Sequence, residues 1–235
     1  MNLIFTMAGK YRRFFDNGYK IPKYLLPWKS NTIFYEILSE FTKRYSFKNI
    51  FFIVNKNDSA YLNIIGFIIE EFNISKHNIY AIEDTKSQAE TAFLGIKYFE
   101  HLINSDPVIF HNIDTILYDR NFFDIERALE IHDGYIDIFS SDSEEYSYIE
   151  YTANIVNRIE EKKVISNSAS SGLYGFKNID LYLKYYSEEA NYISDLYKKM
   201  IANDNKIICG KLYSIAETIV LGTPEEYLRA ICKLR

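Results

Sequence analysis

Over the first two-thirds of the chain, short apolar segments alternate with amphipathic segments of helical period. Apolar, β-rich runs lie at Leu3–Met7, Asn49–Val54 and Pro107–His111. Such short, continuously apolar runs are typical of strands that are buried on both faces. Between them, segments such as Gln88–Leu102 repeat apolar side chains at helical spacing. This order is typical of βαβ units and predicts an α/β fold: a single Rossmann-like three-layer domain with a mixed, mainly parallel central sheet.

From about residue 146 the pattern changes to runs that are typical of antiparallel strands, so we expect a smaller antiparallel region in this part of the chain. No Pro/Gly-rich linker or internal repeat separates it from the first part, which favours one domain over residues 1–235. The further strands that we expect are Ile79–Ile82, Tyr135–Phe139, Tyr146–Val156, Lys163–Ile165, Gly172–Phe176 and Ser214–Val220. The further helices that we expect lie at 32–45, 62–72, 122–131, 179–203 (two helices) and after Pro224.

Composition excludes several classes of protein. The 235 residues are 48% hydrophobic, which is enough for a core and excludes disorder by composition. The net charge of −5 argues against nucleic-acid partners and against a polybasic membrane anchor. No apolar run is long enough to cross a bilayer. Cys209 and Cys232 match no metal or redox spacing, so we expect a cytoplasmic protein without a disulfide framework.

The first expected strand opens into a basic loop that contains glycine. Five of the fourteen residues from Lys10 to Lys23 are Lys or Arg, in a chain that is acidic as a whole. The connection between the first strand and the first helix is where α/β folds bind phosphates. Arg offers a bidentate donor, Lys a mobile charge, and loop amides can hold oxyanions. The alternative, an ordinary basic surface loop, is the weaker interpretation of this density of charge.

Short motifs follow one another along nearly the whole chain. They are Met7-Ala8-Gly9-Lys10-x-x-Arg13-Phe14, Gly18-Tyr19, Pro22-Lys23, Gln88-Ala89-Glu90-Thr91, Asn112-Ile113-Asp114, Glu161-Lys162, Ser171-Gly172-Leu173-Tyr174-Gly175-Phe176 and Gly222-Thr223-Pro224-Glu225. These motifs resemble those of the nucleotidyltransferases that activate phosphorylated sugars and related acceptors. Each motif is weak alone, but their order along the chain is that of the family.

This resemblance implies a GT-A-type fold, with a nucleotide-binding part at 1–145 and an acceptor-binding part at 146–235. It implies Mg²⁺-dependent transfer of a nucleoside monophosphate from a nucleoside triphosphate to a phosphorylated small molecule, with release of pyrophosphate. By the same resemblance, Arg13 and Lys23 would be catalytic and Asp114 would hold the metal. The nucleotide would contact Met7, Ala8, Gly9, Lys10, Gln88, Glu90, Thr91 and Asn112, and the acceptor would contact Glu161, Lys162 and Gly172.

The chain departs from the family pattern at two positions. Tyr11 replaces the second glycine of the loop, so the backbone there cannot approach a triphosphate as closely as glycine would allow. Val220 stands where the family often has a second metal-binding Asp. This disfavours a site with two metal ions: either Asp114 holds the only protein-bound magnesium ion, or another carboxylate such as Glu217 substitutes for the missing Asp. We favour the first alternative.

The substrates stay open at this point. The compact chain is most similar to nucleotidyltransferases of capsule and surface-polysaccharide loci, whose acceptors include sugar phosphates, phosphocholine, glycerol phosphate and phosphorylated glutamine. Tyr11 weakens the assignment as a sugar-1-phosphate thymidylyl- or uridylyltransferase, so we favour CTP as the donor. A GT-A glycosyltransferase and a catalytically silent nucleotide-binding protein are the other classes. The first usually has Asp-x-Asp, whereas this chain has Asn112-Ile113-Asp114. The resemblance allows a monomer or a homodimer.

Overall fold

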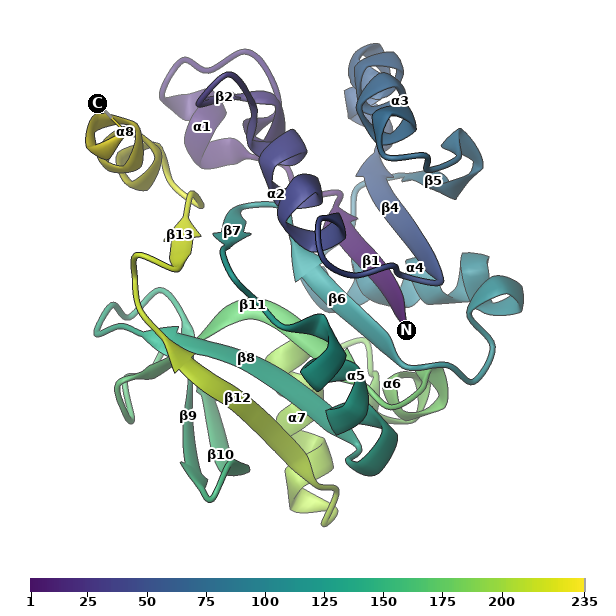
Figure 1. The fold of residues 1–235 in the computed structure, drawn as a ribbon, viewed down its shortest axis with the longest axis vertical. Helices are drawn as coiled ribbons and strands as arrows, with labels where there is room; N and C mark the ends of the chain where they lie inside the picture. The colour runs from purple at the N-terminus through teal and green to yellow at the C-terminus, as the bar shows by residue number, and fades with distance from the viewer. Residues whose placement is uncertain (235) are drawn as a thin grey trace.

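A nine-stranded mixed sheet forms the centre of the molecule in the computed structural model, which describes residues 1–234 (Figure 1). Its strand order is β5-β4-β1-β6-β11-β8-β12-β10-β9. The first four strands are parallel neighbours: β5 (Ile79–Ile82), β4 (Asn49–Asn55), β1 (Asn2–Met7) and β6 (Val108–Asn112).

The second half of the sheet begins with β11 (Ser168–Phe176), which runs antiparallel to both β6 and β8 (Gly134–Ser140). β12 (Ile207–Tyr213) is parallel to β8. The antiparallel hairpin of β9 (Ser147–Thr152) and β10 (Ile155–Glu161) completes this half (Figure 1).

Helices cover both faces of the sheet, so the domain has three layers. Successive residues of a strand point to opposite faces. Phe5 and Phe52 therefore pack on one face, and Ile4 and Phe51 on the other. The first face is covered by α2 (Ile33–Thr42), α3 (Leu62–Glu71) and α5 (Phe122–Ile131), and the second by α4 (Gln88–Ile103), α6 (Ile179–Tyr185) and α7 (Ile193–Ala202).

Short elements complete the edge of the molecule at which the parallel strands end. α1 (Arg12–Asp16) follows β1, and the small hairpin of β2 (Pro27–Trp28) and β3 (Asn31–Thr32) leads into α2. β7 (Thr115–Leu117) pairs with β13 (Thr218–Val220). The last helix, α8 (Pro224–Lys233), begins with a capping box of Thr223 and Glu226.

Local sequence explains where the other helices begin. Thr32, Ser87 and Asn178 each accept a backbone hydrogen bond at the first turn of α2, α4 and α6. Short polar side chains at this position satisfy amide groups that have no partner within the helix.

The expected strands and helices of the first 140 residues are present with small shifts of their ends, but the second part differs from expectation. The expected strand Tyr146–Val156 is two strands, β9 and β10, joined by a turn in which Ala153 and Asn154 both have positive φ. Lys163–Ile165 is not a strand. β12 was not expected, and the predicted last strand shortens to β13.

The sheet is mixed, as expected, and antiparallel pairings slightly outnumber parallel ones. Four of its strand pairings are parallel. Five are antiparallel. The cause is β11, which enters the sheet between β6 and β8 in the reverse direction. Hydrophobic patterning specifies that a strand is buried but not its direction.

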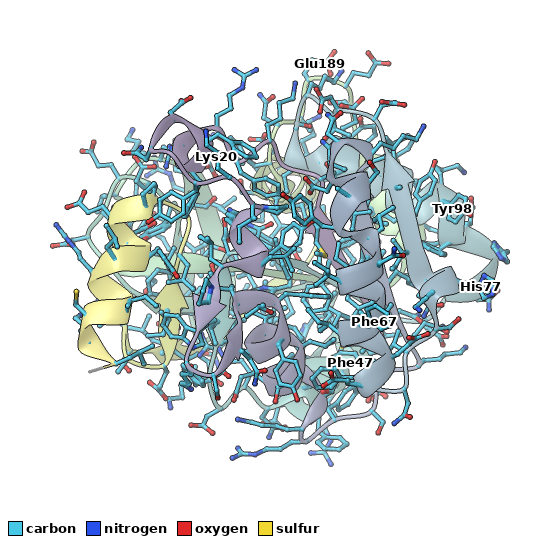
Figure 2. All side chains as sticks on the ribbon, turned by 90° about the horizontal axis from the view of Figure 1, so that it is seen from above. Lys20, Phe47, Phe67, His77, Tyr98 and Glu189 are labelled. Atoms are coloured by element: carbon cyan, nitrogen blue, oxygen red, sulfur yellow. The ribbon has the colours of Figure 1, made fainter. Side chains whose placement is uncertain are left out.

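The surface carries isolated apolar side chains. Figure 2 labels Phe67 of α3 and Tyr98 of α4, which are 64% and 50% exposed. Within residues 1–234 no helix combines the length and the apolar character needed to cross a membrane.

Candidate active site

Two adjoining clefts lie at the ends of β1 and β6. The larger cleft has a volume of about 660 Å³ and is lined by the loop after β1, the start of α4 and the end of β6. The smaller cleft has a volume of about 220 Å³ and is lined by β9, β11 and the segment before α8. Both are lined by Arg13, Gln88, Asn112, Asp114, Tyr192 and Gly222. The arrangement can therefore place two small molecules next to each other.

The loop after β1 contributes Ala8, Gly9, Lys10 and Tyr11 to the larger cleft. Two of its carbonyl groups are held by the protein. The Tyr11 hydroxyl lies 2.5 Å from the Met7 carbonyl oxygen, and Asn55 Nδ2 donates to the Ala8 carbonyl oxygen at 3.1 Å. These contacts fix the positions of the two carbonyl groups at the start of the loop.

Tyr11 adopts φ 47° and ψ 28°, the left-handed conformation that glycine favours. The loop thus takes the backbone shape expected of a glycine with a tyrosine in its place. The Tyr11 ring packs edge to face on Tyr24, with 5.6 Å between the ring centroids.

Three of the basic residues of the loop form ion pairs at the clefts. Lys10 Nζ lies 2.8 Å from Asp84 Oδ2, and Arg13 lies 3.1 Å from a carboxylate oxygen of Glu145. Both pairs are solvent-exposed, so each contributes little to stability, and their cations are free to exchange partners. Arg12 also lines the larger cleft, whereas Lys20 is exposed outside both and projects from the surface in Figure 2.

The third pair joins Lys23 and Asp114 at the junction of the two clefts. Lys23 Nζ lies 2.6 Å from Asp114 Oδ2, and the two side chains are only 15% and 24% exposed. Burial acts to raise the pKa of the Asp114 carboxyl. The neighbouring Lys23 ammonium lowers this pKa by a larger amount, so that it lies below its ordinary value. Asp114 is therefore a carboxylate at neutral pH. Sequence reasoning named both residues but not their contact.

Asp114 is suited to hold a magnesium ion that is bound mainly by substrate. Mg²⁺ commonly takes one or two protein carboxylates and completes its shell with water and phosphate oxygens. Within residues 1–234 no three His, Cys, Asp or Glu side chains gather in a way that could hold a metal by themselves.

Val220, which stands where the family often has a second metal-binding Asp, lies near Asp114 in the fold. Val220 lies opposite Thr115 in the β7–β13 pair and lines the smaller cleft. Glu217 lines neither cleft. Its carboxylate accepts hydrogen bonds from the backbone N–H and hydroxyl of Ser214 and pairs with Lys211. Its position makes Glu217 a poor substitute ligand.

The start of α4 forms one wall of the larger cleft. Gln88 Nε2 donates to Asn112 Oδ1 at 2.5 Å, and Thr91 also lines this wall. The structure places Glu90 outside both clefts. Its carboxylate accepts from the backbone N–H of Lys86 at 2.7 Å, as expected of an acidic residue in a first helical turn.

The predicted acceptor residues line the smaller cleft. Glu161 Oε2 accepts hydrogen bonds from the hydroxyls of Ser147 and Ser194. Lys162 Nζ donates to the Tyr192 hydroxyl at 3.1 Å, a hydrogen bond that raises the pKa of this lysine. Gly172 has φ 86°, and a Cβ atom there would lie 3.0 Å from Asn112 Nδ2. Glycine thus allows close approach between β11 and the end of β6.

Several lining residues carry no motif that could have identified them. Tyr192 lines both clefts, yet it precedes α7 in an unremarkable polar stretch. His111, which we did not predict as a site residue, lines neither cleft. It is fully buried, and its Nε2 lies 2.8 Å from the Thr115 carbonyl oxygen.

Several solved structures that resemble this chain are described as nucleotidyltransferases or pyrophosphorylases. A nucleoside-diphosphate-sugar pyrophosphorylase from Vibrio cholerae RC9 is 27% identical, with a TM-score of 0.82 over 97% of this chain and 98% of that chain. The inositol-1-phosphate CTP transferase from T. maritima is 10% identical, with a TM-score of 0.71 over 99% and 93% of the two chains. A UDP-glucose pyrophosphorylase complexed with UDP-glucose is 16% identical, with a TM-score of 0.73 over 100% and 99%.

No protein-family model matches the chain, and no curated protein matches its sequence. The structural neighbours support an enzyme of the nucleotidyltransferase type. The fold is the firmest part of this likeness, since most of these neighbours are less than 20% identical to the chain.

Proposed function

We propose that the protein transfers a nucleoside monophosphate from a nucleoside triphosphate to a phosphorylated small molecule and releases pyrophosphate. The observation that carries this proposal is the Lys23–Asp114 pair at the junction of two clefts of unequal size. The larger cleft would hold the triphosphate and the smaller cleft the acceptor.

In this reaction an acceptor phosphate oxygen attacks the α-phosphorus in line. The new P–O bond forms while the bond between the α-phosphorus and the pyrophosphate oxygen breaks. The acceptor phosphate is already an anion at pH 7, so the protein must mainly hold the reactants and offset their repulsion. Lys23 would neutralise charge at the α-phosphate, and Arg13, which lines both clefts, would stabilise the departing pyrophosphate.

A magnesium ion held by Asp114 would supply positive charge to the phosphate oxygens. Met7, Ala8, Gly9, Lys10, Gln88, Thr91 and Asn112 are the candidate nucleotide contacts, and Glu161, Lys162 and Gly172 the candidate acceptor contacts. Glu90 remains a candidate only through its effect on the start of α4.

For the substrates, we propose CTP and an acceptor of capsule or surface-polysaccharide precursor synthesis, as with phosphorylated glutamine. The motif pattern and Tyr11 support this choice. A sugar-1-phosphate with UTP or dTTP is the second candidate, and the neighbours described as sugar-nucleotide pyrophosphorylases favour it. We also propose a GT-A-type domain with its nucleotide part at 1–145 and its acceptor part at 146–235, acting in the cytoplasm.

A thermal-shift panel of ATP, GTP, CTP, UTP and dTTP, each with and without Mg²⁺, tests the donor. A ligand at about 100 times its Kd stabilises the folded state by about 2.7 kcal/mol, which is measurable. We expect one nucleotide to raise the melting temperature in a magnesium-dependent way. Pyrophosphate release with phosphorylated acceptors then tests the reaction. Stabilisation by a sugar nucleotide without pyrophosphate release would favour a glycosyltransferase, and nucleotide binding without turnover a silent protein.

A further inference from the structure

Three side chains from separate segments meet beneath the loop that follows β1. Tyr24 donates its hydroxyl proton to Asp58 Oδ2 at 2.8 Å, and the Tyr11 hydroxyl lies 3.2 Å from the same oxygen. Tyr24 is fully buried, and Asp58 is 6% exposed. Asp58 lies in the turn that follows β4, outside every motif that marks the site.

Each tyrosine belongs to a segment that carries a proposed reactive group. Tyr11 ends the loop of the larger cleft, and its hydroxyl also reaches the Met7 carbonyl oxygen at the start of that loop. Tyr24 directly follows Lys23 in the 3₁₀ turn Lys23–Leu25, and its ring packs against Phe34 of α2. A single carboxylate oxygen therefore connects the loop to the segment of the lysine.

Packing alone does not require this arrangement. A buried carboxylate must be removed from water, and apolar residues of similar volume often stabilise a core as well or better. A satisfied polar network instead holds its members in one geometry. Burial raises the pKa of Asp58, while the hydrogen bonds from Tyr24 and Tyr11 oppose that rise.

The loop also needs an external constraint. Tyr11 holds a left-handed backbone conformation that is strained for a non-glycine residue, and such a conformation persists only where its surroundings enforce it. The contacts with Met7 and Asp58 are the polar contacts of the Tyr11 side chain among the described residues.

We propose that Asp58 is a positioning residue that fixes the loop Ala8–Tyr11 relative to Lys23 through its contacts with the hydroxyls of Tyr11 and Tyr24. The expected effect on catalysis rests on the proposed function, but the structural link between the two segments does not. In this chain the network maintains a loop shape that a glycine would adopt without support.

Hydrogen exchange of the free, full-length protein tests the link without any substrate. Tyr11→Phe and Tyr24→Phe each remove one hydroxyl and keep the ring. If Asp58 joins the two segments, Tyr11→Phe raises amide exchange at residues 22–26, and Tyr24→Phe raises it at residues 8–16. Asp58→Asn, which can still accept both hydrogen bonds, keeps exchange close to wild type. Exchange that changes only in the segment that carries the substitution overturns the proposal.

Steady-state kinetics test the effect of this network on catalysis. A misplacement of about 1 Å can cost roughly 100-fold in rate. We expect each Tyr→Phe variant to lower kcat by about 10- to 100-fold with a smaller change in KM, and Asp58→Asn to retain most of the wild-type rate. Tyr61→Phe is the matched control, because it removes a nearby hydroxyl that donates to the Lys20 carbonyl oxygen at 3.1 Å and not to Asp58. We expect its kcat to stay close to wild type. Unchanged kcat in both variants contradicts the positioning role. Absence of turnover in the wild-type protein refutes the proposed function, and exchange alone then decides on the link.

Discussion

Lys23 and Asp114 are 91 positions apart in the chain and form a partly buried ion pair. Each neutralises the other in the free protein. In the proposed function, a triphosphate with its magnesium ion would offer both a stronger partner, since the ammonium would turn to phosphate oxygens and the carboxylate to the metal. The ion pair would then separate when substrate binds.

Lys23→Ala should lower kcat by at least about 100-fold, because the cation acts mainly on charge that develops in the transition state. The Kd for the nucleotide should change far less. Steady-state kinetics and a binding titration measure the two effects. Lys20→Ala is the control, since Lys20 is exposed outside both clefts. Equal losses in rate and affinity would mean that Lys23 only binds.

Asp114→Asn should abolish the magnesium dependence of nucleotide binding, because an amide is a poor ligand for Mg²⁺ compared with a carboxylate. Thermal shifts with nucleotide, with and without Mg²⁺, give the readout. Glu217→Gln, which changes a carboxylate outside both clefts, should leave that dependence intact. Persistent enhancement by Mg²⁺ in Asp114→Asn would assign the metal to other residues.

At the scale of elements, the site depends on how closely β6 and β11 approach. The pairing of β11 with β8 is interrupted between Ser170 and Tyr174. Gly172 lies in this irregular segment with positive φ, against Asn112. Irregular strands of this kind re-aim side chains next to functional sites.

Gly172→Ala should destabilise the protein by about 1–3 kcal/mol, because alanine is strained at positive φ and its Cβ would press on Asn112. Urea unfolding measures the change. Gly9→Ala is a suitable control for stability, since a Cβ there meets nothing within 4 Å and φ is not positive. Equal stability of the two variants would show that β11 relaxes freely.

We expect the stability of the protein to depend on pH through His111, at the end of β6. Burial is the main cause that lowers the pKa of His111, and Arg120 acts in the same direction, whereas Asp114 and the Thr115 and Gly172 backbone groups oppose them; the resulting pKa is about 4. The unfolded chain takes up this proton near pH 6.5. Stability is therefore lost as pH falls from 7 towards 4.

At pH 5 the loss from this group is about 2 kcal/mol relative to pH 7. Urea unfolding at both pH values measures it, and His111→Asn should reduce the difference. His77, on the surface in Figure 2, provides the control His77→Gln, which should not change the pH dependence. An unaltered pH dependence in His111→Asn would assign the effect to carboxylates.

At the scale of the whole molecule, Arg120 joins the sheet to the β7–β13 pair. Its side chain is 1% exposed and lies 2.9 Å from the fully buried carboxylate of Asp137 in β8. It also donates to Thr218 and to the Glu217 carbonyl oxygen, and stacks 3.6 Å above the Tyr213 ring centroid. These contacts of Arg120 therefore attach the β7–β13 pair, which forms part of the wall of the smaller cleft, to the central sheet.

Arg120→Met should cost about 3–5 kcal/mol, because Asp137 would remain as an unpaired buried charge. Arg229→Met removes an exposed pair with Glu225 and should cost less than about 1 kcal/mol. Chemical denaturation compares the two variants. Similar small losses would show that water reaches Asp137 once the arginine is removed.

Much of the architecture follows from local sequence. Apolar runs such as Asn49–Val54 specify buried strands, and capping residues such as Ser87 and Thr223 specify where helices begin, because these signals act within a few residues. The basic loop after β1 and the polar end of β6 could be predicted in the same way, since parallel strands place their ends at one edge of the sheet.

Contacts between distant segments could not be predicted. β12 and the reversed β11 depend on which neighbours remain unpaired once the other strands have packed, and the roles of Tyr192 and Asp58 depend on segments brought together from far along the chain. Local sequence specifies the kinds of elements and the chemistry of the loop. Which charges pair follows from the folded arrangement alone, because pairing depends on distances that no local pattern encodes.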